Sequence, residues 1–253
     1  METDMKILAI DSSGMVASVA VWENGLLIAE YSMNYKKTHS QTLLPMLEDV
    51  KEKIELDMQT VDAIAVAAGP GSFTGLRIGS ATAKGLGFAL DIPVISVPTV
   101  DALAYNLYGW DKIVCPLMDA RRNQTYTGLY EFVRTEKERT DMEVATNSGY
   151  DMCVIEEQCA VMIEDILEKC NALGKEVIFL GDGVPVFAEA IKQQMKVPYS
   201  FAPAHLNRQS AGALASLAAI YYAEGKVQTA AEHAPEYLRL SQAERERALQ
   251  DRT

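Results

Sequence analysis

Several segments carry residue types that can hold an anion, and the first follows the first predicted strand. Asp11-Ser12-Ser13-Gly14 occupies a predicted turn between two strands, where hydroxyls and backbone N–H groups can face an anion. Asp and Ser also dominate turns that only satisfy their own backbone. The segment therefore indicates an anion-binding turn or an ordinary polar turn, and its composition alone favours the ordinary turn.

The most distinctive segment is a glycine-rich loop, Gly69-Pro-Gly-Ser-Phe-Thr-Gly-Leu-Arg77. It leads directly into a predicted helix over residues 73–90, whose first N–H groups are unpaired and can receive an anion. The Gly-Lys-Ser/Thr ending of a Walker loop is absent, so the segment is not a nucleotide loop of that class.

Small residues recur every four positions along this predicted helix. They are Gly71, Gly75, Gly79, Ala83 and Gly87. Each isolated helical glycine costs about 1 kcal/mol relative to alanine, so close packing against another backbone is expected to offset the loss. That backbone can belong to the same chain or to a partner protein, and the stripe alone does not decide between them.

Two segments in the second half are candidates for binding turns. Asp119-Ala-Arg-Arg122 places two adjacent arginines where they can grip carboxylates of a partner or simply lie in solvent. Gly181-Asp-Gly183 is interpreted as a glycine-lined connection between a strand and a helix.

Cysteine and histidine are too few for most metal or disulfide chemistry. Four cysteines without Cys-x-x-Cys spacing are expected to be reduced, and three histidines nearly exclude a histidine-rich metal centre. His39, just before a predicted helix, is interpreted as a cap or surface residue rather than a ligand. The cysteines are Cys115, Cys153, Cys159 and Cys170.

The composition is that of a globular, acidic protein. Apolar residues make up 49% of 253 residues, and the net charge of -12 is expected to repel the phosphates of a nucleic acid over most of the surface. Any RNA should then be held by another subunit, although acidity also simply favours solubility. No apolar run is long enough for a membrane helix and the start is acidic, so a cytoplasmic protein is expected.

The elements that position these segments form two similar halves. Strands are predicted at 5–10, 17–22 and 26–31, with an Asn24-Gly25 hairpin turn, followed by a helix from about residue 40 to 54 that Pro45 bends or begins. A buried strand at 62–68 precedes the glycine-rich loop, and another strand lies at 92–97. Three antiparallel strands followed by alternating helices and strands indicate a mixed sheet covered by helices.

The second half loosely repeats this pattern. Strands are predicted at 112–118, 124–132 and 177–180, with a charged insertion at 134–143 and helices at about 155–173, 186–195 and 210–224. The predicted organisation is a first lobe over residues 1–108, a second over 109–205, a C-terminal helix over 206–240 packed back on the first lobe, and a frayed tail over 241–253. Two lobes without a flexible linker imply a cleft.

Taken in order and spacing, these motifs resemble the TsaB (YeaZ) family along essentially the whole chain. The long glycine-loop motif is highly specific, and the shorter ones gain weight as an ordered set. The matching segments are Ile7–Ser13, His39–Pro45, Gly69–Gly79, Ala83–Gly85, Asp119–Arg122, Gly181–Gly183 and Pro235–Arg239.

This resemblance implies a two-lobed actin-like ATPase-domain fold of the ribonuclease H-like class. It implies a subunit that supports transfer of a threonylcarbamoyl group to N6 of adenosine 37 in tRNAs reading ANN codons. The expected partners are a TsaD-type catalytic paralogue, a TsaE-type ATPase and, when alone, a second copy. tRNA contact is expected to be indirect. No cofactor of its own is expected, and ATP or ADP can lie at the multi-subunit interface.

The resemblance also assigns roles to residues. The glycine stripe and the helix before it become the partner surface, and the phosphate and adenosine turns of actin-like folds match three of the turns above. The expected interface residues are Leu43, Leu47, Phe73, Gly75, Arg77, Gly79, Ala83 and Gly87. The expected vestigial nucleotide turns contain Asp11, Ser12, Ser13, Asp119, Gly181 and Gly183.

One departure from the paralogue concerns catalysis. The catalytic subunit carries a His-x-x-x-His metal pair, and the matching positions here are Thr99 and Leu103. Neither can replace an imidazole on a metal, so no catalytic or metal-binding residue is expected. A peptidase activity is not expected either.

An alternative from another class is an ATP-dependent small-molecule kinase that uses the cleft. Such an enzyme needs a carboxylate base and a Mg²⁺-binding acid, for which Asp11 and Asp119 are the candidates.

Overall fold

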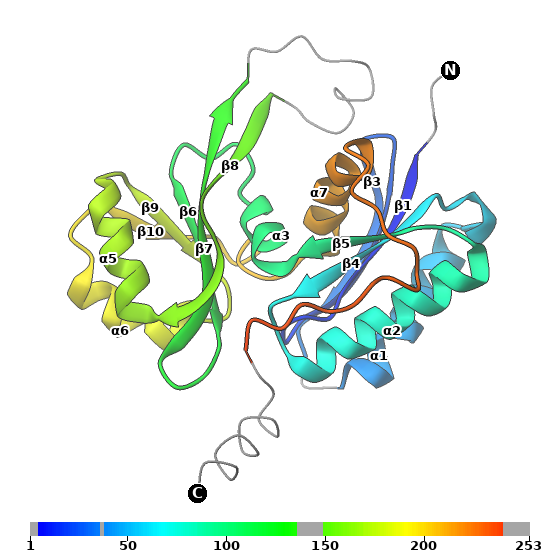
Figure 1. Ribbon diagram of the computed structural model, residues 1–253, viewed down its shortest axis with the longest axis horizontal. Helices are drawn as coiled ribbons and strands as arrows, with labels where there is room; N and C mark the ends of the chain where they lie inside the picture. The colour runs from blue at the N-terminus through cyan, green and yellow to red at the C-terminus, as the bar shows by residue number, and fades with distance from the viewer. Residues whose placement is uncertain (1–4, 36–37, 136–148, 240–253) are drawn as a thin grey trace, which may run out of the picture.

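The computed structural model describes residues 5–35, 38–135 and 149–239, which form two lobes side by side (Figure 1). The predicted tail at 241–253 and most of the charged insertion at 134–143 lie outside the described residues.

The first lobe is built on a five-stranded mixed sheet. Its order is β3-β2-β1-β4-β5, in which β1, β2 and β3 are antiparallel and β4 and β5 continue parallel to β1. The strands are β1 (Lys6–Asp11), β2 (Ala17–Glu23), β3 (Leu26–Met33), β4 (Ala63–Gly69) and β5 (Val94–Pro98). Asn24 and Gly25 both have positive φ, 49° and 86°, as a type I′ turn requires, which confirms the predicted hairpin.

The second lobe repeats the same strand order. β6 pairs antiparallel with β7 and β7 with β8, while β9 lies parallel to β6 and β10 parallel to β9. The strands are β6 (Ile113–Asp119), β7 (Gln124–Arg134), β8 (Tyr150–Met162), β9 (Val177–Leu180) and β10 (Tyr199–Phe201). Two mixed sheets of this order with flanking helices are the actin-like architecture that the sequence implied, so the predicted fold is confirmed.

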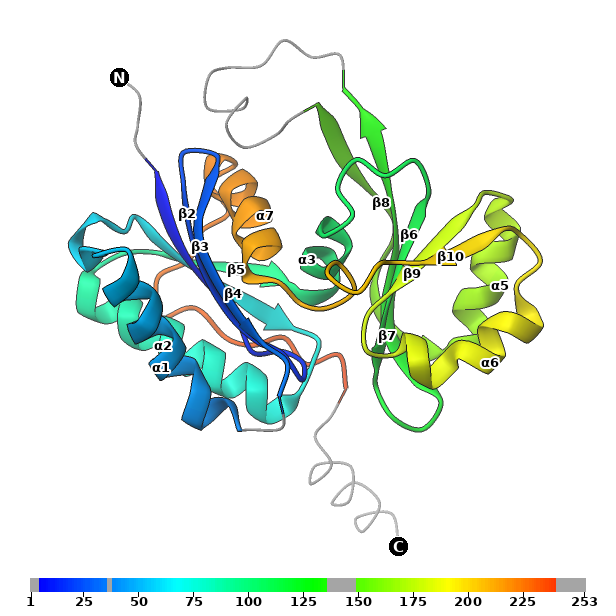
Figure 2. The ribbon, with the colours of Figure 1, turned by 180° about the vertical axis from the view of Figure 1, so that it is seen from behind.

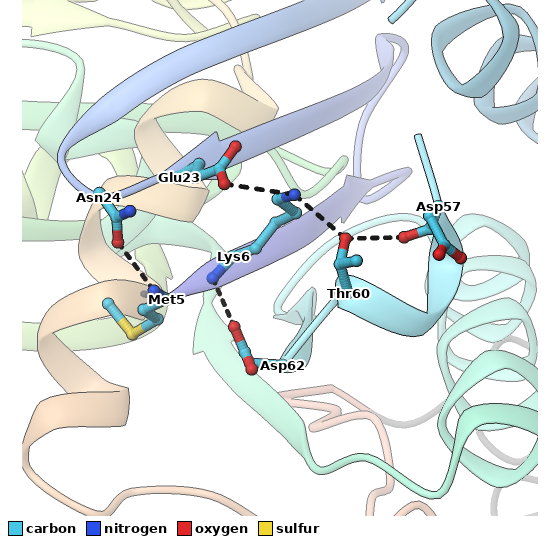
Figure 3. Close-up of polar contacts among 7 residues, drawn as sticks. All are labelled: Met5, Lys6, Glu23, Asn24, Asp57, Thr60 and Asp62. Atoms are coloured by element: carbon cyan, nitrogen blue, oxygen red, sulfur yellow. Dashed lines mark hydrogen bonds and ion pairs between the residues drawn. The ribbon is translucent and has the colours of Figure 1, made fainter. Parts of the chain in front are cut away.

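Polar contacts fix the start of β1 between its neighbours (Figure 3). The backbone N–H of Lys6 donates to the Asp62 carboxylate at 2.7 Å, and that of Met5 donates to the Asn24 side chain at 2.7 Å. The Lys6 ammonium reaches Glu23 at 3.3 Å and the Thr60 hydroxyl at 3.1 Å. β1 is therefore held in register before its far end enters the Asp11 turn.

Helices cover both faces of each sheet (Figures 1 and 2). α1 (His39–Lys53) and α2 (Phe73–Leu90) lie on the outer face of the first sheet, and α5 (Ile163–Leu173) and α6 (Val184–Gln194) on that of the second. Between the sheets lie α3 (Thr99–Tyr105) and α7 (Ala211–Ala223). A short 3₁₀ turn spans Met58–Thr60.

One hydrophobic core crosses from lobe to lobe through these two inner helices. α7 follows the last strand of the second lobe yet packs on β1 and β2, and α3 follows the last strand of the first lobe yet also packs on β6 and β7. The core joins Ile7 and Ala9 of β1 with Val114 of β6 and Tyr130 of β7. The lobes therefore share a buried interior at the base of the cleft.

The predicted helix at 155–173 is wrong in its first half. β8 continues to Met162 and α5 begins only at Ile163. Ile155, Cys159 and Met162 have helical spacing, but pairing along β7 holds this stretch extended. Pro45 lies well inside α1 rather than in its first turn, and neither α3 nor β10 was predicted.

Candidate functional site

A cleft of about 680 Å³ lies between the lobes. The first lobe contributes the Asp11 turn through residues 13–15 and the glycine-rich loop through residues 70–73. The second contributes residues 118–121 and Asp182. Residues 236–239 of the C-terminal segment line it as well, so segments far apart in the chain meet here, as the two-lobed prediction required.

The Asp11 carboxylate is turned toward its own backbone. Asp11 is 1% exposed, and its Oδ1 accepts from the backbone N–H of Ser13 at 2.8 Å and from the Ser13 hydroxyl at 2.6 Å. Burial raises the pKa of this carboxyl above its ordinary value, while the two bonds from Ser13 oppose the shift. Oδ2 finds no hydrogen-bond partner among the described residues. Oδ1 therefore bonds within the turn, as in the ordinary polar turn that its composition favoured, whereas Oδ2 is left without a partner among the described residues.

The Asp119 turn on the opposite wall does the same. Asp119 Oδ1 accepts from the backbone N–H of Arg121 at 2.8 Å, and Oδ2 lies 2.9 Å from the exposed Arg121 guanidinium. The backbone N–H of Asp119 donates in turn to Asp182 at 3.3 Å. Burial raises the pKa of Asp182, and the bond from Asp119 opposes this shift. Two carboxylates thus serve the N–H groups of this turn.

The fold class implies a nucleotide in this cleft, and the turns do not fit its phosphates as they stand. A phosphate-binding turn offers free backbone N–H groups to the anion. The N–H groups of Ser13, Asp119 and Arg121 instead donate to carboxylates of this chain. Those carboxylates would also repel a phosphate, so no nucleotide-dependent step is derived for the chain.

Gly181 and Gly183 serve close packing rather than ligand contact. Gly181 has φ +108°, and a Cβ at this position would collide with the Leu117 carbonyl of β6. A Cβ on Gly183 would lie 2.8 Å from the same oxygen. These glycines let the β9–α6 connection approach β6, as the structural interpretation of the motif expected.

The glycine stripe of α2 faces the chain's own interior, which corrects its assignment to a partner interface. A Cβ on Gly75 would collide with the Ser12 carbonyl, and a Cβ on Gly79 would lie 2.5 Å from the Ser12 hydroxyl. That hydroxyl donates to the Gly75 carbonyl at 2.9 Å. The stripe is therefore smooth because the Asp11 turn lies directly on it.

Most other predicted interface residues are buried as well. They are Leu43, Leu47, Ala83 and Gly87. Ala83 and Leu43 belong to the core beneath α1 and α2, and Gly87 packs beside Ala230. Of the predicted set, only Arg77 is exposed and Phe73 half-buried.

The solvent-facing side of α1 and α2 carries a different set of residues. Thr74, Ala81 and Gly85 are exposed along α2, and no described atom outside the helix lies within 4 Å of a Cβ on Gly85. Two large apolar side chains border this face, Leu44 of α1 at 58% exposure and Phe88 of α2 at 63%. We call Leu44, Thr74, Ala81, Gly85 and Phe88 the outer face. Its signal in the sequence was an apolar residue on the polar side of each helix.

The two positions that match the paralogue's metal histidines lie in the core. The Thr99 hydroxyl accepts from the Gly69 N–H at 3.1 Å, and Leu103 is 1% exposed among apolar neighbours. Within residues 5–35, 38–135 and 149–239, no group of three His, Cys, Asp or Glu side chains is placed to hold a metal.

His39 ties the start of α1 to the cleft. Its Nε2 lies 2.8 Å from the Gly14 carbonyl, so it donates a hydrogen bond to the Asp11 turn. The N-cap of α1 is Thr38, and the His39 ring is partly buried against the turn. His39 thus links the start of α1 to the Asp11 turn by a hydrogen bond, and is not the cap or surface residue that was expected.

The C-terminal segment contributes residues whose role sequence reasoning missed. Tyr237 stacks on Phe73 with ring centroids 4.7 Å apart, and Arg77 donates to its hydroxyl at 3.3 Å. Arg239 donates to the Ala120 carbonyl.

Among the described helices, none is both long and apolar enough to cross a membrane.

Comparison with known proteins points to one family. A family model described as TsaD, tRNA N6-adenosine threonylcarbamoyltransferase, matches residues 27–247. The tRNA threonylcarbamoyladenosine biosynthesis protein TsaB of Bacillus subtilis is 34% identical over 95% of this chain and 96% of its own. TsaB of Escherichia coli is 35% identical over 50% of this chain and 55% of its own.

Solved structures agree with the sequence comparison. The structure of YeaZ from Pseudomonas aeruginosa superimposes with a TM-score of 0.73 at 28% identity, covering 92% of this chain and all of that chain. A second structure, described as similar to peptidase YEAZ from Pseudomonas aeruginosa, gives a TM-score of 0.74 at 28% identity and covers 93% of this chain and all of that one.

Proposed function

We propose, for a chain that belongs to the TsaB family of tRNA threonylcarbamoyladenosine biosynthesis proteins, the role of a non-catalytic partner subunit. Its partner is a TsaD-type catalytic paralogue, which it activates for threonylcarbamoyl transfer to N6 of adenosine 37 in tRNAs reading ANN codons. A TsaE-type ATPase assists the pair. The outer face of α1 and α2 is the observation that carries this proposal.

The outer face has the composition of a docking surface for helices. Leu44 and Phe88 are more than half exposed, and exposed apolar side chains gathered on one face mark interaction sites on soluble proteins. Ala81 and Gly85, exposed on α2, present almost no side chain, so a partner helix can approach the backbone of α2 closely. An apolar anchor beside a smooth ridge favours a helical partner, or a second copy of the chain when the partner is absent.

Three observations support a role without chemistry. Thr99 and Leu103 are committed to the core at the positions where the paralogue holds its metal. The cleft carboxylates Asp11 and Asp119 accept hydrogen bonds within their own turns, so both are engaged in local structure. The net charge of -12 favours leaving tRNA to other subunits. We place this role in the cytoplasm, and ATP or ADP at the interface between subunits.

The first test measures transfer activity. The purified chain alone is expected to give no threonylcarbamoyl transfer to tRNA, and its addition to the TsaD-type and TsaE-type subunits is expected to restore transfer. The assay follows threonylcarbamoyladenosine in digested tRNA by mass spectrometry. Robust transfer by the chain without the TsaD-type subunit contradicts the proposal.

The second test locates the docking surface. Leu44→Arg is expected to weaken binding to the TsaD-type subunit by about tenfold or more, because it puts a charge where an apolar anchor is buried. Val186→Arg on α6 is the matched control, since Val186 is also 58% exposed but lies on the second lobe. Calorimetry measures both affinities, and equal binding by the two folded variants excludes the outer face.

The kinase alternative is tested by the same method with Mg-ATP. A kinase needs free N–H groups for the phosphates and an acceptor base in the cleft. The occupied N–H groups of Ser13 and Arg121 favour weak or absent binding. Tight binding with turnover of ATP would instead favour the kinase.

A further inference from the structure

The segment that follows α7 runs back along α2 and then enters the cleft (Figure 1). We call residues 227–239 the C-terminal strap. It begins with an antiparallel bridge in which the backbones of Gln228 and Val94 exchange hydrogen bonds of 2.8 and 2.9 Å. It ends at residues 236–239, which line the cleft between the lobes.

The strap is anchored to the first lobe at points along its whole length. The Lys84 ammonium donates to the His233 carbonyl at 2.7 Å, and the His233 ring lies 2.7 Å from the Ser96 hydroxyl. The backbone N–H of Glu236 donates to the Ala68 carbonyl at 2.7 Å. Tyr237 then stacks on Phe73 at the start of α2.

The strap reaches the second lobe only at its end. The Glu236 carboxylate accepts from the Gln158 amide of β8 at 3.0 Å. Arg239 donates to the Ala120 carbonyl in the turn after β6. Glu236 therefore bonds the first lobe through its backbone and the second through its side chain. The strap is firmly held on one lobe and lightly held on the other.

These contacts lie at the cleft, where residues 236–239 meet both lobes. The lobes also share a core that includes residues of α3 and α7, and in Figure 1 the strap runs along α2 and ends between α2 and β7. Two lobes joined through a shared core can rotate about that junction, and a second contact between them fixes the angle. A bound ligand usually supplies that contact in hinged proteins.

We propose that the strap is an intramolecular clasp that holds the two lobes closed and limits access to the cleft. Glu236 and Arg239 of the strap hold the second lobe through the Gln158 side chain and the Ala120 carbonyl. The clasp needs no partner subunit, so this inference goes beyond the proposed docking role and can fail or succeed independently of it.

The test removes the contacts between the strap and the second lobe in the full chain. Gln158→Ala combined with Arg239→Ala removes both strap contacts to the second lobe while leaving the anchors at Lys84, Ser96 and Phe73 intact. Amides of residues 71–73 and 118–121 are expected to exchange hydrogen at least about threefold faster by mass spectrometry. The radius of gyration from small-angle scattering should rise as well.

Two further variants make the result decisive. Gln158→Glu places a second carboxylate against Glu236 and is expected to open the cleft by repulsion. Lys175→Ala removes an exposed ion pair with Glu131 elsewhere in the second lobe and is expected to change nothing at the cleft. Unchanged exchange at residues 71–73 and 118–121 in the folded double variant overturns the clasp. So does an equal increase in Lys175→Ala.

Discussion

At the scale of the residue, the nearest neighbouring atom determines whether a glycine of α2 could carry a side chain. Gly75 lies under the Ser12 carbonyl, so a methyl group has no room there, whereas Gly85 faces open space on the same helix. The same scale explains the turns, where the Asp11 and Asp119 carboxylates occupy N–H groups that could otherwise hold an anion. The space above Gly75 and the N–H groups of the two turns are thus both occupied by groups of the same chain.

The two glycines make a matched prediction. Gly75→Ala is expected to destabilise the fold by about 1–3 kcal/mol, because the new methyl group meets backbone that cannot rotate away. Gly85→Ala is expected to stabilise it by up to about 1 kcal/mol, since alanine favours an exposed helix over glycine. Urea unfolding of both variants measures the difference. A Gly75→Ala variant as stable as wild type would mean that the turn is loosely packed on α2.

The stripe also shows what the sequence could predict at this scale and what it could not. A spacing of four residues correctly predicted that one face of α2 packs closely against a backbone. It could not identify that backbone, because Ser12 is more than sixty positions away in the chain. The choice between core and partner depended on a tertiary contact that no local pattern contains.

At the scale of the element, α3 carries a buried carboxylate that links three parts of the fold. Asp101 accepts from the Tyr130 hydroxyl of β7 at 2.6 Å and from the Tyr221 hydroxyl of α7 at 3.4 Å. Burial raises the pKa of Asp101, the two tyrosine bonds oppose that shift, and the nearby Glu157 and Glu236 charges add to it. The inner helices are therefore joined through a group that resists ionisation.

This group predicts a direction of pH dependence. The folded-state pKa of Asp101 is raised, so its contribution to stability is fully present below the unfolded pKa of about 4 and is lost as pH rises through the folded pKa. Asp101→Asn cannot ionise and keeps the bond from Tyr130. The variant is expected to gain stability relative to wild type as pH rises from 4 to 7, measured by urea midpoints. A constant difference across this range would show that Asp101 titrates normally.

Elements differed in how far local sequence could predict them. The boundaries of α2 and β9 were predicted as observed, because the glycine-rich loop precedes α2 and Gly181-Asp-Gly183 follows β9, while α2 ends at Asp91 in the left-handed conformation. β8 was read as the start of a helix, since its apolar residues suit both periods and only pairing with β7 selects the strand. α3 was missed because a seven-residue helix buried at every position shows no amphipathic pattern.

At the scale of the whole molecule, the two lobes are duplicates that cannot be separated along the chain. Each sheet has the same strand order, yet α7 from the second half covers the first sheet and α3 from the first half contacts the second. The residue order predicted two lobes and a C-terminal helix packed back on the first lobe, where α7 lies, but it did not predict α3 or its packing on the second sheet. One shared core between the sheets results, and the apolar inner face of each sheet is covered only when both halves are present.

A shared core predicts that the lobes unfold together. The chain has two tryptophans, Trp22 in β2 of the first lobe and Trp110 in the connection to the second, and both pack on the shared core. Trp110→Phe leaves Trp22 as the fluorescent probe, and Trp22→Phe leaves Trp110. In urea, each variant's fluorescence midpoint is expected to coincide with its own circular dichroism midpoint, as two-state unfolding requires. Independent lobes would instead give a fluorescence midpoint that departs from the dichroism midpoint in at least one variant. Coincidence in both would mean that α3 and α7 couple the lobes through the core, and that the clasp adjusts the cleft of a molecule that folds as one unit.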